Sequence, residues 1–343
     1  MNRPRQRFRC LQCQKRFSSN FYSLDYRNKK SDPALNSKIF LFCVNGISNR
    51  AIGRIQSISP NCVRMRLLRL SRRSLCFHHE MIKDFKISEP VCFDGLQNFA
   101  GTQYDPNNLQ QALGRDSLFI YDFNFASMNR RGRTSRWQKN RLRQLEADFG
   151  RYNPSAIQVA TGTILRRLFQ MSANAKTGLT LLSDEHYQYR KAIREDLKDC
   201  IFEHVTISSK VCRNFQNILF NVNHADLRIR QLLASFIRET ISFSKTPGAM
   251  CLKYILFMVY KNYMAPQFTK KHVRRPEAHL KSPAQHLGLC SKTLSFADIF
   301  NSRSQVKDAQ DLNEDWKEFW HGRVPKAYDR SPIYRKSRQE LTA

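Results

Sequence analysis

Apolar residues recur at helical spacing in three short segments between residues 34 and 75. Two sequence breaks, Asn45-Gly46 and Ser59-Pro60, separate these segments. Three short helices with such breaks predict a helix-turn-helix unit. The apolar positions are Leu35, Ile39, Phe42 and Cys43 in the first, Ile52 and Ile55 in the second, and Val63, Leu67 and Leu70 in the third.

Beyond Ile87 the pattern becomes typical of strands with helices between them. Residues 90–94, 117–125, 179–182 and 202–207 are short apolar runs that predict strands. After the strand at 117–125, a basic segment at 130–143 merges into helical periodicity that continues through 169. Further helical segments are 186–197, 223–241 and 249–264, and a short helical patch lies at 296–300. This alternation predicts an α/β core.

The chain therefore divides into four regions. Residues 1–30 form a basic arm with one Cys pair, and residues 31–80 form the helix-turn-helix region. Residues 85–265 form the α/β core with a helical insertion near 130–175, and residues 266–343 form a basic, Pro-containing tail.

The charge balance indicates the class of partner. The 343 residues include 58 Lys+Arg against 28 Asp+Glu, a net charge of +30. Such an excess favours a polyanion, because neutralising phosphates releases their counterions. A small-molecule enzyme is disfavoured by this charge and by the lack of a cofactor-binding loop.

The cysteines and apolar runs favour a cytoplasmic protein without a membrane span. Ten Cys lie mostly in apolar runs, which fits buried, reduced thiols. The longest apolar run, 249–264, contains two Lys and is too short to cross a bilayer. The basic N-terminus lacks the apolar region of a signal peptide.

One pair of cysteines has the spacing of half a zinc site. Cys10 and Cys13 could bind Zn²⁺, but a tetrahedral site needs two more ligands. Cys76, His78 and His79 could supply them only if the chain folds back. Two unrelated cysteines explain the spacing equally well.

The third helix of the helix-turn-helix pattern could enter a DNA major groove. In that case the residues that contact DNA would be Arg50, Arg54, Asn61, Arg64 and Arg66. The alternative is a three-helix packing unit with a solvated basic face.

Two carboxylates follow predicted strands far apart in the chain. Taken alone, Asp94-Gly95 is a tight hairpin turn and Asp184 is a helix N-cap. Together they fit a two-metal phosphoryl-transfer site, in which acidic groups converge on Mg²⁺ ions. His186 could orient a phosphate there or simply cap a helix.

Five ordered blocks resemble those of DDE-type bacterial insertion-sequence transposases. They are VCFDGLQNF (91–99), LTLLSDEHYQY (179–189), NHADLRIRQLLASFIRETISFSK (223–245), KNYM (261–264) and SPAQHLGL (282–289). The resemblance covers about residues 8–300. It implies a ribonuclease-H-like mixed-sheet catalytic core with Asp94 and Asp184 as metal ligands. It also implies an N-terminal zinc ribbon and helix-turn-helix before that core.

The third metal ligand is where the sequence departs most from the family pattern. Asn223 stands where relatives carry the catalytic Glu, and Asp226 lies three residues later on the same helix face. Glu239 lies 13 positions after Asp226, roughly 20 Å along a continuous helix. Asp226 is the favoured ligand, whereas an ion pair with Arg230 is its structural alternative.

Two further departures concern Gly95, where relatives often place Glu, and the missing first Cys pair of the ribbon. The resemblance also implies that four cations hold DNA phosphates beside the metal ions. The alternative is that these cations form a solvated basic face. They are Arg228, Arg230, Arg238 and Lys245. Trp137, Trp316 and Trp320 are expected to be packing residues.

The sequence thus predicts a transposase that binds element ends and then cuts and joins DNA strands. The implied cofactors are two Mg²⁺ or Mn²⁺ ions, and the implied partners are double-stranded DNA and further copies of the chain on paired ends. No membrane and no small-molecule substrate is expected, and the location is the bacterial cytoplasm, at the nucleoid. The alternative is a catalytically inactive, transposase-derived DNA-binding protein or regulator.

Overall fold

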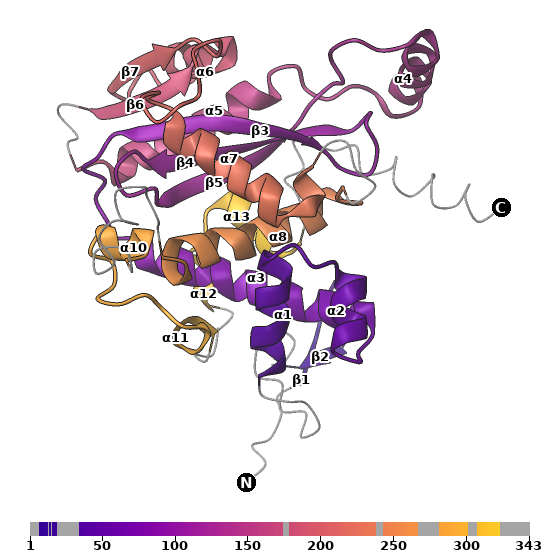
Figure 1. The fold of residues 1–343 in the computed structure, drawn as a ribbon. Coiled ribbons are helices and arrows are strands. Elements are labelled where there is room, and N and C mark those ends of the chain that lie inside the picture. Colours follow the sequence, from indigo (N-terminus) through magenta and orange to yellow (C-terminus); the bar gives the residue numbers. More distant parts are fainter. Residues whose placement is uncertain are drawn as a thin grey trace.

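A mixed five-stranded sheet forms the centre of the protein (Figure 1). A computed structural model describes residues 7–12, 14, 16–18, 34–173, 178–237, 243–266, 281–300 and 307–322. The strand order is β5-β4-β3-β6-β7; the first three strands are antiparallel, and β6 and β7 run parallel to β3. The predicted α/β class with a mixed sheet is confirmed. The strands are β3 (Val91–Phe99), β4 (Pro106–Gly114), β5 (Ile120–Ser127), β6 (Leu179–Asp184) and β7 (Phe202–Ile207).

Strand β4 has no counterpart among the predicted strands. Its sequence, PNNLQQALG, is rich in amide side chains, which are depleted in strands, yet every residue of it is buried. The amides find partners across the sheet: Gln110 Nε2 donates to Ile157 O at 3.1 Å and to Thr161 Oγ1 at 3.0 Å. Tertiary hydrogen bonds therefore outweigh the local preference of this segment.

Helices cover both faces of the sheet (Figure 1). Helix α5 (Ala156–Met171) packs on one face against β4 and β5, whereas α7 (Phe220–Leu232) packs on the other against β3 and β4. Helix α8 (Pro247–Val259) lies between that second face and α3 (Pro60–Ile82). The remaining segments near the sheet are α4 (Arg136–Phe149), α6 (Tyr187–Lys191), η2 (Ala192–Asp196), η3 (Ala234–Phe236) and η4 (Tyr260–Met264).

The three predicted N-terminal helices are present as α1 (Leu35–Val44), α2 (Asn49–Ile55) and α3. Ser48 and Ser59 cap α2 and α3 by accepting backbone N–H bonds. Gly53 permits the tight turn between them, because a Cβ there would lie 2.8 Å from Ile58 O. Helix α3 is longer than expected, and its buried residues join the same hydrophobic core as the sheet, so the three-helix unit is built onto the core.

Part of the expected basic tail contributes to the core. The short helix α11 (Phe296–Phe300) lies where the sequence predicts it, and α10 (Pro283–His286), α12 (Lys307–Gln310) and α13 (Glu314–Trp320) accompany it. Trp316 and Trp320 are buried, as expected. Trp137 is 68% exposed, so the prediction that it packs in the core is wrong.

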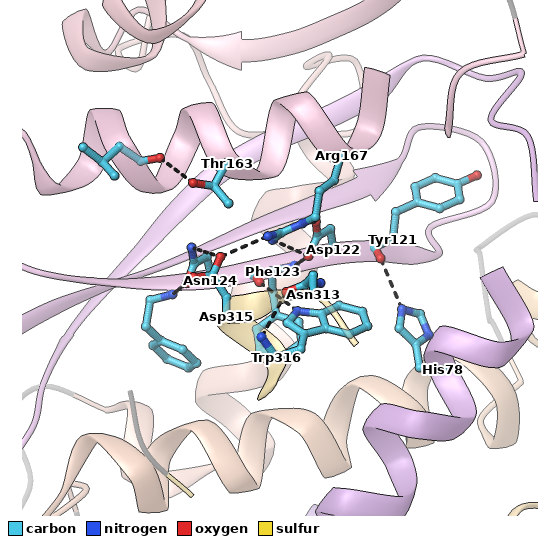
Figure 2. Close-up of polar contacts among 12 residues, drawn as sticks. His78, Tyr121, Asp122, Phe123, Asn124, Thr163, Arg167, Asn313, Asp315 and Trp316 are labelled. Carbon is cyan, nitrogen blue, oxygen red and sulfur yellow. Dashed lines mark hydrogen bonds and ion pairs between the residues drawn. The ribbon is translucent and has the colours of Figure 1, made fainter. Parts of the chain in front are cut away.

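A buried ion pair holds α13 against the edge strand β5 (Figure 2). Arg167 on α5 donates Nε to Asp122 Oδ2 at 2.6 Å and Nη1 to Asp315 Oδ2 at 3.0 Å. The Asn124 amide also donates to Asp315, and Trp316 Nε1 donates to Phe123 O at 3.4 Å. One guanidinium therefore joins α5, β5 and the first turn of α13.

None of the helices in the described ranges is long and apolar enough to cross a membrane.

Asp122→Ala is expected to lower the free energy of unfolding by about 3–5 kcal/mol, because it leaves the buried Arg167 short of a partner. The adjacent exposed pair of Arg166 with Asp199 is the matched control. Asp199→Ala should change stability little, since water screens that pair. Urea unfolding of both variants checks this, and equal losses would contradict the role given to Arg167.

Candidate functional site

Asp94 lies inside β3, on the sheet face that α7 covers. It pairs with Gln111 across the antiparallel ladder, and the parallel register Phe93↔Ser183 places Asp184 beside it. Side chains of paired residues point to the same face, so Asp94, Gln111 and Asp184 share one face. The predicted strand end at Asp94 and the alternative hairpin turn are both wrong.

Gly95 explains how the strand continues past Asp94. A Cβ at Gly95 would collide with the Asn108 amide, which lies over it from β4. Only glycine leaves room for that close approach. The Asp-Gly pair is therefore a packing feature inside the sheet, and it keeps Asp94 away from the strand's end.

Asp184 ends β6, as the sequence predicts. Its Oδ1 accepts the His186 N–H at 3.0 Å. The His186 ring in turn accepts the Gln188 N–H at 3.3 Å and caps α6. Of the two roles open to His186, capping is therefore present.

A small polar hollow lies at these carboxylates, under the loop that joins β7 to α7. Asp94, Asp184 and Asn223 line it together with Arg213 and Asn217. Its volume is about 20 Å³, which fits one water-sized species. A larger hollow of about 640 Å³ lies over the outer surface of α5, lined by residues such as Gln158 and Arg166, and contains none of the predicted site residues.

Asp226 lies one helical turn beyond Asn223 and is held by Gln111. Gln111 Nε2 donates to Asp226 Oδ1 at 2.5 Å, and the Tyr254 hydroxyl donates to Gln111 Oε1 at 3.0 Å. This chain of bonds crosses from α8 through β4 to α7. The hydrogen bond of Asp226 is therefore to Gln111, although Arg230 acts on it through its charge.

Burial and mutual repulsion make two of these carboxylates weak acids. Burial first, and then the charge of Asp184, raise the pKa of Asp94 to about 6, against lowering by the Gly95 N–H and by Arg213 and Arg230. Burial first, and then the charge of Asp94, raise the pKa of Asp226 to about 8. Carboxylates that repel each other in a buried site favour a proton or a cation between them.

The chemistry of the donors fits a hard divalent cation. Carboxylate oxygens are the ligands that Mg²⁺ and Mn²⁺ prefer. Within the described part of the chain, however, no three Asp, Glu, His or Cys side chains are grouped closely enough to hold a metal together. Asp94 and Asp184 are the pair at the hollow, and the amide of Asn223 is the third side chain there from the candidate ligands.

Four of the five residues predicted to contact DNA in the helix-turn-helix are exposed: Arg50, Arg54, Asn61 and Arg64. Arg66 is 6% exposed, and its Nη1 donates to Asn36 Oδ1 of α1 at 2.7 Å. Arg66 thus stabilises the packing of α3 on α1. Its position on the inward face of α3 follows from the helical period.

The cations predicted beside the metals are placed differently from one another. Arg230 is exposed and close enough to Asp94 and Asp226 to lower the pKa of both. Arg228 is exposed and donates to Gln231 Oε1 at 2.8 Å. Lys245 lies over the Phe243 ring, next to Ser244, which bridges to Ala100 after β3. Arg238 and Glu239 lie outside the described residues.

Cys10 lies in the turn of a small hairpin formed by β1 (Arg7–Arg9) and β2 (Arg16–Ser18). Its predicted partner Cys13 lies outside the described residues. His78, a suggested further ligand, is fully buried, with its ring nitrogens 2.8 Å from the Tyr263 hydroxyl and 3.2 Å from Tyr121 O. His78 is thus a core residue (Figure 2).

Sequence reasoning missed Gln111 and Arg213, which complete the site. Gln111 lies in β4, whose amide-rich sequence is untypical of a strand. Its place opposite Asp94 follows only from the observed pairing of β3 with β4. Arg213 belongs to the loop after β7 and lowers the pKa of Asp94 and Asp226. The basic character of that loop is the only signal that the sequence offers.

Arg64 and Arg66 provide a matched pair of substitutions. If the predicted helix-turn-helix binds DNA, Arg64→Ala should weaken that binding without changing the melting temperature, because Arg64 is exposed and bonded locally to Asn61. Arg66→Ala should lower the melting temperature by about a few °C, because the half-buried Asn36 amide loses its hydrogen-bond partner. Melting curves and DNA titrations check both, and the reverse assignment of effects would contradict the placement of α3.

The raised pKa of Asp226 predicts a pH-dependent stability in the absence of metal. Its folded pKa exceeds the unfolded value of about 3.9, so the folded protein holds the proton more tightly and loses stability as pH rises from about 4 through about 8. Asp226→Asn keeps an oxygen for Gln111 and removes this loss. With EDTA present, the variant should melt above the natural protein at pH 8, and the gap should narrow toward pH 5.

Asp298→Asn is the control for that series. The backbone N–H and hydroxyl of Ser295 lower the pKa of Asp298 to about 2, so its charge does not change between pH 5 and 8. Its effect on the melting temperature should be the same throughout that range. A constant gap for Asp226→Asn as well would refute the assigned titration.

Comparison with known proteins adds no family to this geometry. No protein-family model and no curated protein matches the chain. What supports a function is therefore the group of residues itself: Asp94 and Asp184 on adjacent parallel strands, with α7 packed against the strand that carries Asp94.

Proposed function

We propose that the chain is a DNA-processing protein of the DDE transposase type, built on a ribonuclease-H-like core. The observation that carries this proposal is the pair Asp94 and Asp184, side by side on adjacent parallel strands at one polar hollow. Carboxylates at this spacing in sequence meet only through the fold. Their shared function is then the binding of a divalent cation at a phosphodiester.

The connectivity of the sheet supports the same proposal. Three antiparallel strands, β3 to β5, are followed by α4 and α5 and then by two strands parallel to β3. This arrangement is compatible with a ribonuclease-H-like core. It explains why the first carboxylate lies on the central strand and the second at the end of its parallel neighbour.

Divalent ions at this site would be held by Asp94 and Asp184 at the hollow. Asp226, which Gln111 holds one turn beyond Asn223, would have to leave that bond to become the third carboxylate. When bound, such ions neutralise charge on a phosphodiester and lower the pKa of an attacking oxygen. The residues of the chain supply the rest. Arg213 and Arg230 place positive charge beside the carboxylates, where a phosphate of the substrate would lie.

The DNA partner is supported by the distribution of exposed cations. A net charge of +30 and the exposed Arg50, Arg54 and Arg64 on α2 and α3 fit a phosphate backbone. Because α3 continues into the core, DNA bound there would have a fixed orientation relative to the carboxylates. Assembly of copies on paired ends belongs to this proposal.

A second candidate function is a DNA-binding protein that does not cut. Asn223 lines the hollow where the family carries Glu, and an amide brings no charge to Mg²⁺. Asp226, with its pKa near 8, is held by Gln111. These observations favour a copy that keeps the binding surface and has lost part of the metal site.

Nicking of DNA that carries the element ends separates the two candidates. With Mg²⁺ or Mn²⁺, the natural protein should nick, and Asp94→Ala and Asp184→Ala should each lower the rate at least about 10²-fold, because the ions lose a ligand at the transition state. DNA affinity should be unchanged. Asp199→Ala is the control, because Asp199 is exposed, pairs with Arg166 and does not line the hollow.

The third ligand is resolved in the same assay. If Asp226 serves, Asp226→Ala should be as inactive as Asp94→Ala, and Asn223→Ala should keep most of the activity. Nicking by Asp184→Ala at the natural rate would refute the catalytic proposal. Binding without any nicking by the natural protein would favour the second candidate.

A further inference from the structure

Residues 130–151 connect β5 to α5 and extend away from the sheet; we call this segment the arm. Its two ends are tied together, since Asn129 Nδ2 donates to Tyr152 O and the Tyr152 N–H donates to Asn129 Oδ1, both at 2.9 Å. The Tyr152 hydroxyl donates to Asp105 Oδ1 in the turn between β3 and β4. The arm therefore leaves and rejoins the core at one fixed neck.

Contacts with the end of β3 orient the arm. The Arg130 guanidinium lies 5.3 Å from the centre of the Phe99 ring, and Gln138 Nε2 donates to Gln103 Oε1 at 3.3 Å. A capping box at Ser135 starts α4, which carries the rest of the arm. Figure 1 shows α4 standing off from the sheet beyond β3.

The arm is strongly basic, and its cations face solvent. It carries eight Lys or Arg against Glu146 and Asp148, an excess of six positive charges. At about 100° per residue, Arg136, Lys139 and Arg143 fall within roughly 60° of arc, on the side of α4 away from the buried Leu145.

These three cations are exposed, and among the described residues the ion pair of the arm is that of Arg151 with Glu146. Glu146 borders this face, about 20° from Lys139, and its charge is paired with Arg151. The three cations therefore leave an excess of positive charge on this face, which is suited to a polyanion. Arg141 is also exposed and donates to Gln144, so its charge adds to the same surface.

The base of the arm adjoins the candidate site. The backbone N–H of His186 donates to Asp184 Oδ1, and the charge of Arg131, at the base of the arm, acts on the His186 imidazole. The arm follows β5, whose end Ser127 pairs with Asn107 beside the end of β3. The arm thus extends from the end of the sheet where β3 and β6 have their carboxyl ends, which is also where Asp184 lies.

Trp137 follows Arg136 in the sequence, about 100° around α4 from it, and is 68% exposed. Its ring is therefore accessible to a partner bound along the arm. Aromatic rings beside Lys and Arg serve nucleic-acid surfaces by packing against sugars or bases.

We propose that the arm is a DNA-binding surface in which Arg136, Lys139 and Arg143 contact the phosphates of a duplex engaged at the carboxylate hollow. This surface is separate from that of α2 and α3. The choice of duplex DNA as the polyanion rests on the proposed function, whereas the charge and placement of the arm do not.

Binding of a short fluorescent duplex of arbitrary sequence to the full chain tests the arm, in EDTA so that no cleavage occurs. The variant is Arg136→Gln, Lys139→Gln and Arg143→Gln together. Its affinity should fall on the order of tenfold at about 0.1 M salt, and the slope of log K against log salt should fall by about 2–3, close to one per lost phosphate contact.

The matched control removes the same charge at the opposite end of the parallel strands, through Lys83→Gln, Lys86→Gln and Lys198→Gln. These exposed lysines precede β3 and β7 at the amino ends of the parallel strands. The control should keep the natural salt slope. An equal loss in the control, or no loss in the arm variant, would overturn the proposal, as would a loss confined to an RNA duplex of the same sequence.

The emission of Trp137 gives an independent readout, because Trp316 and Trp320 are buried. Saturating duplex should quench the natural protein, and Trp137→Phe should remove that change. Unaltered emission at saturation would also overturn the proposal. Since these measurements involve no cutting, a failure of the nicking assay with intact arm binding would count against catalysis alone.

Discussion

The register of β3 between its two neighbours is the constraint on which the rest of the molecule depends. A slip of one residue would turn Asp94 from the α7 face to the α5 face and separate it from Asp184 and Gln111. Close packing fixes this register, since Gly95 fits under Asn108 only in the observed pairing. Glu89 adds a second lock by accepting the N–H groups of the β4–β5 turn and the Tyr121 hydroxyl.

The same centre is unusually polar, and this has a cost. Amides on β4 are buried on both sides of the sheet, and their hydrogen bonds to α5, α7 and α8 make the layers specific to one another. The carboxylates that share this centre repel each other, as the raised pKa values of Asp94 and Asp226 indicate. Groups arranged against their own ionisation are typical of sites that bind a cation or move a proton.

The basic surfaces are attached to this centre through rigid elements. Helix α3 carries the helix-turn-helix residues at one end and core residues along its length, so the two move together. The arm is fixed through its neck at Asn129 and Tyr152. A long polyanion held by both surfaces would therefore meet the carboxylates in a defined orientation, which is what positioning of a phosphodiester requires.

Sequence alone determined the class of the fold, the three N-terminal helices, four of the five strands of the sheet and the basic character, because each rests on local periodicity or on a sum of charges. It also singled out Asp94 and Asp184. Only the tertiary structure decided that β4 is a central strand, that Asp94 lies within β3, that Arg66 is buried and that Gln111 holds Asp226. These outcomes depend on partners distant in the chain, whose hydrogen bonds and packing outweigh the preferences of any single segment.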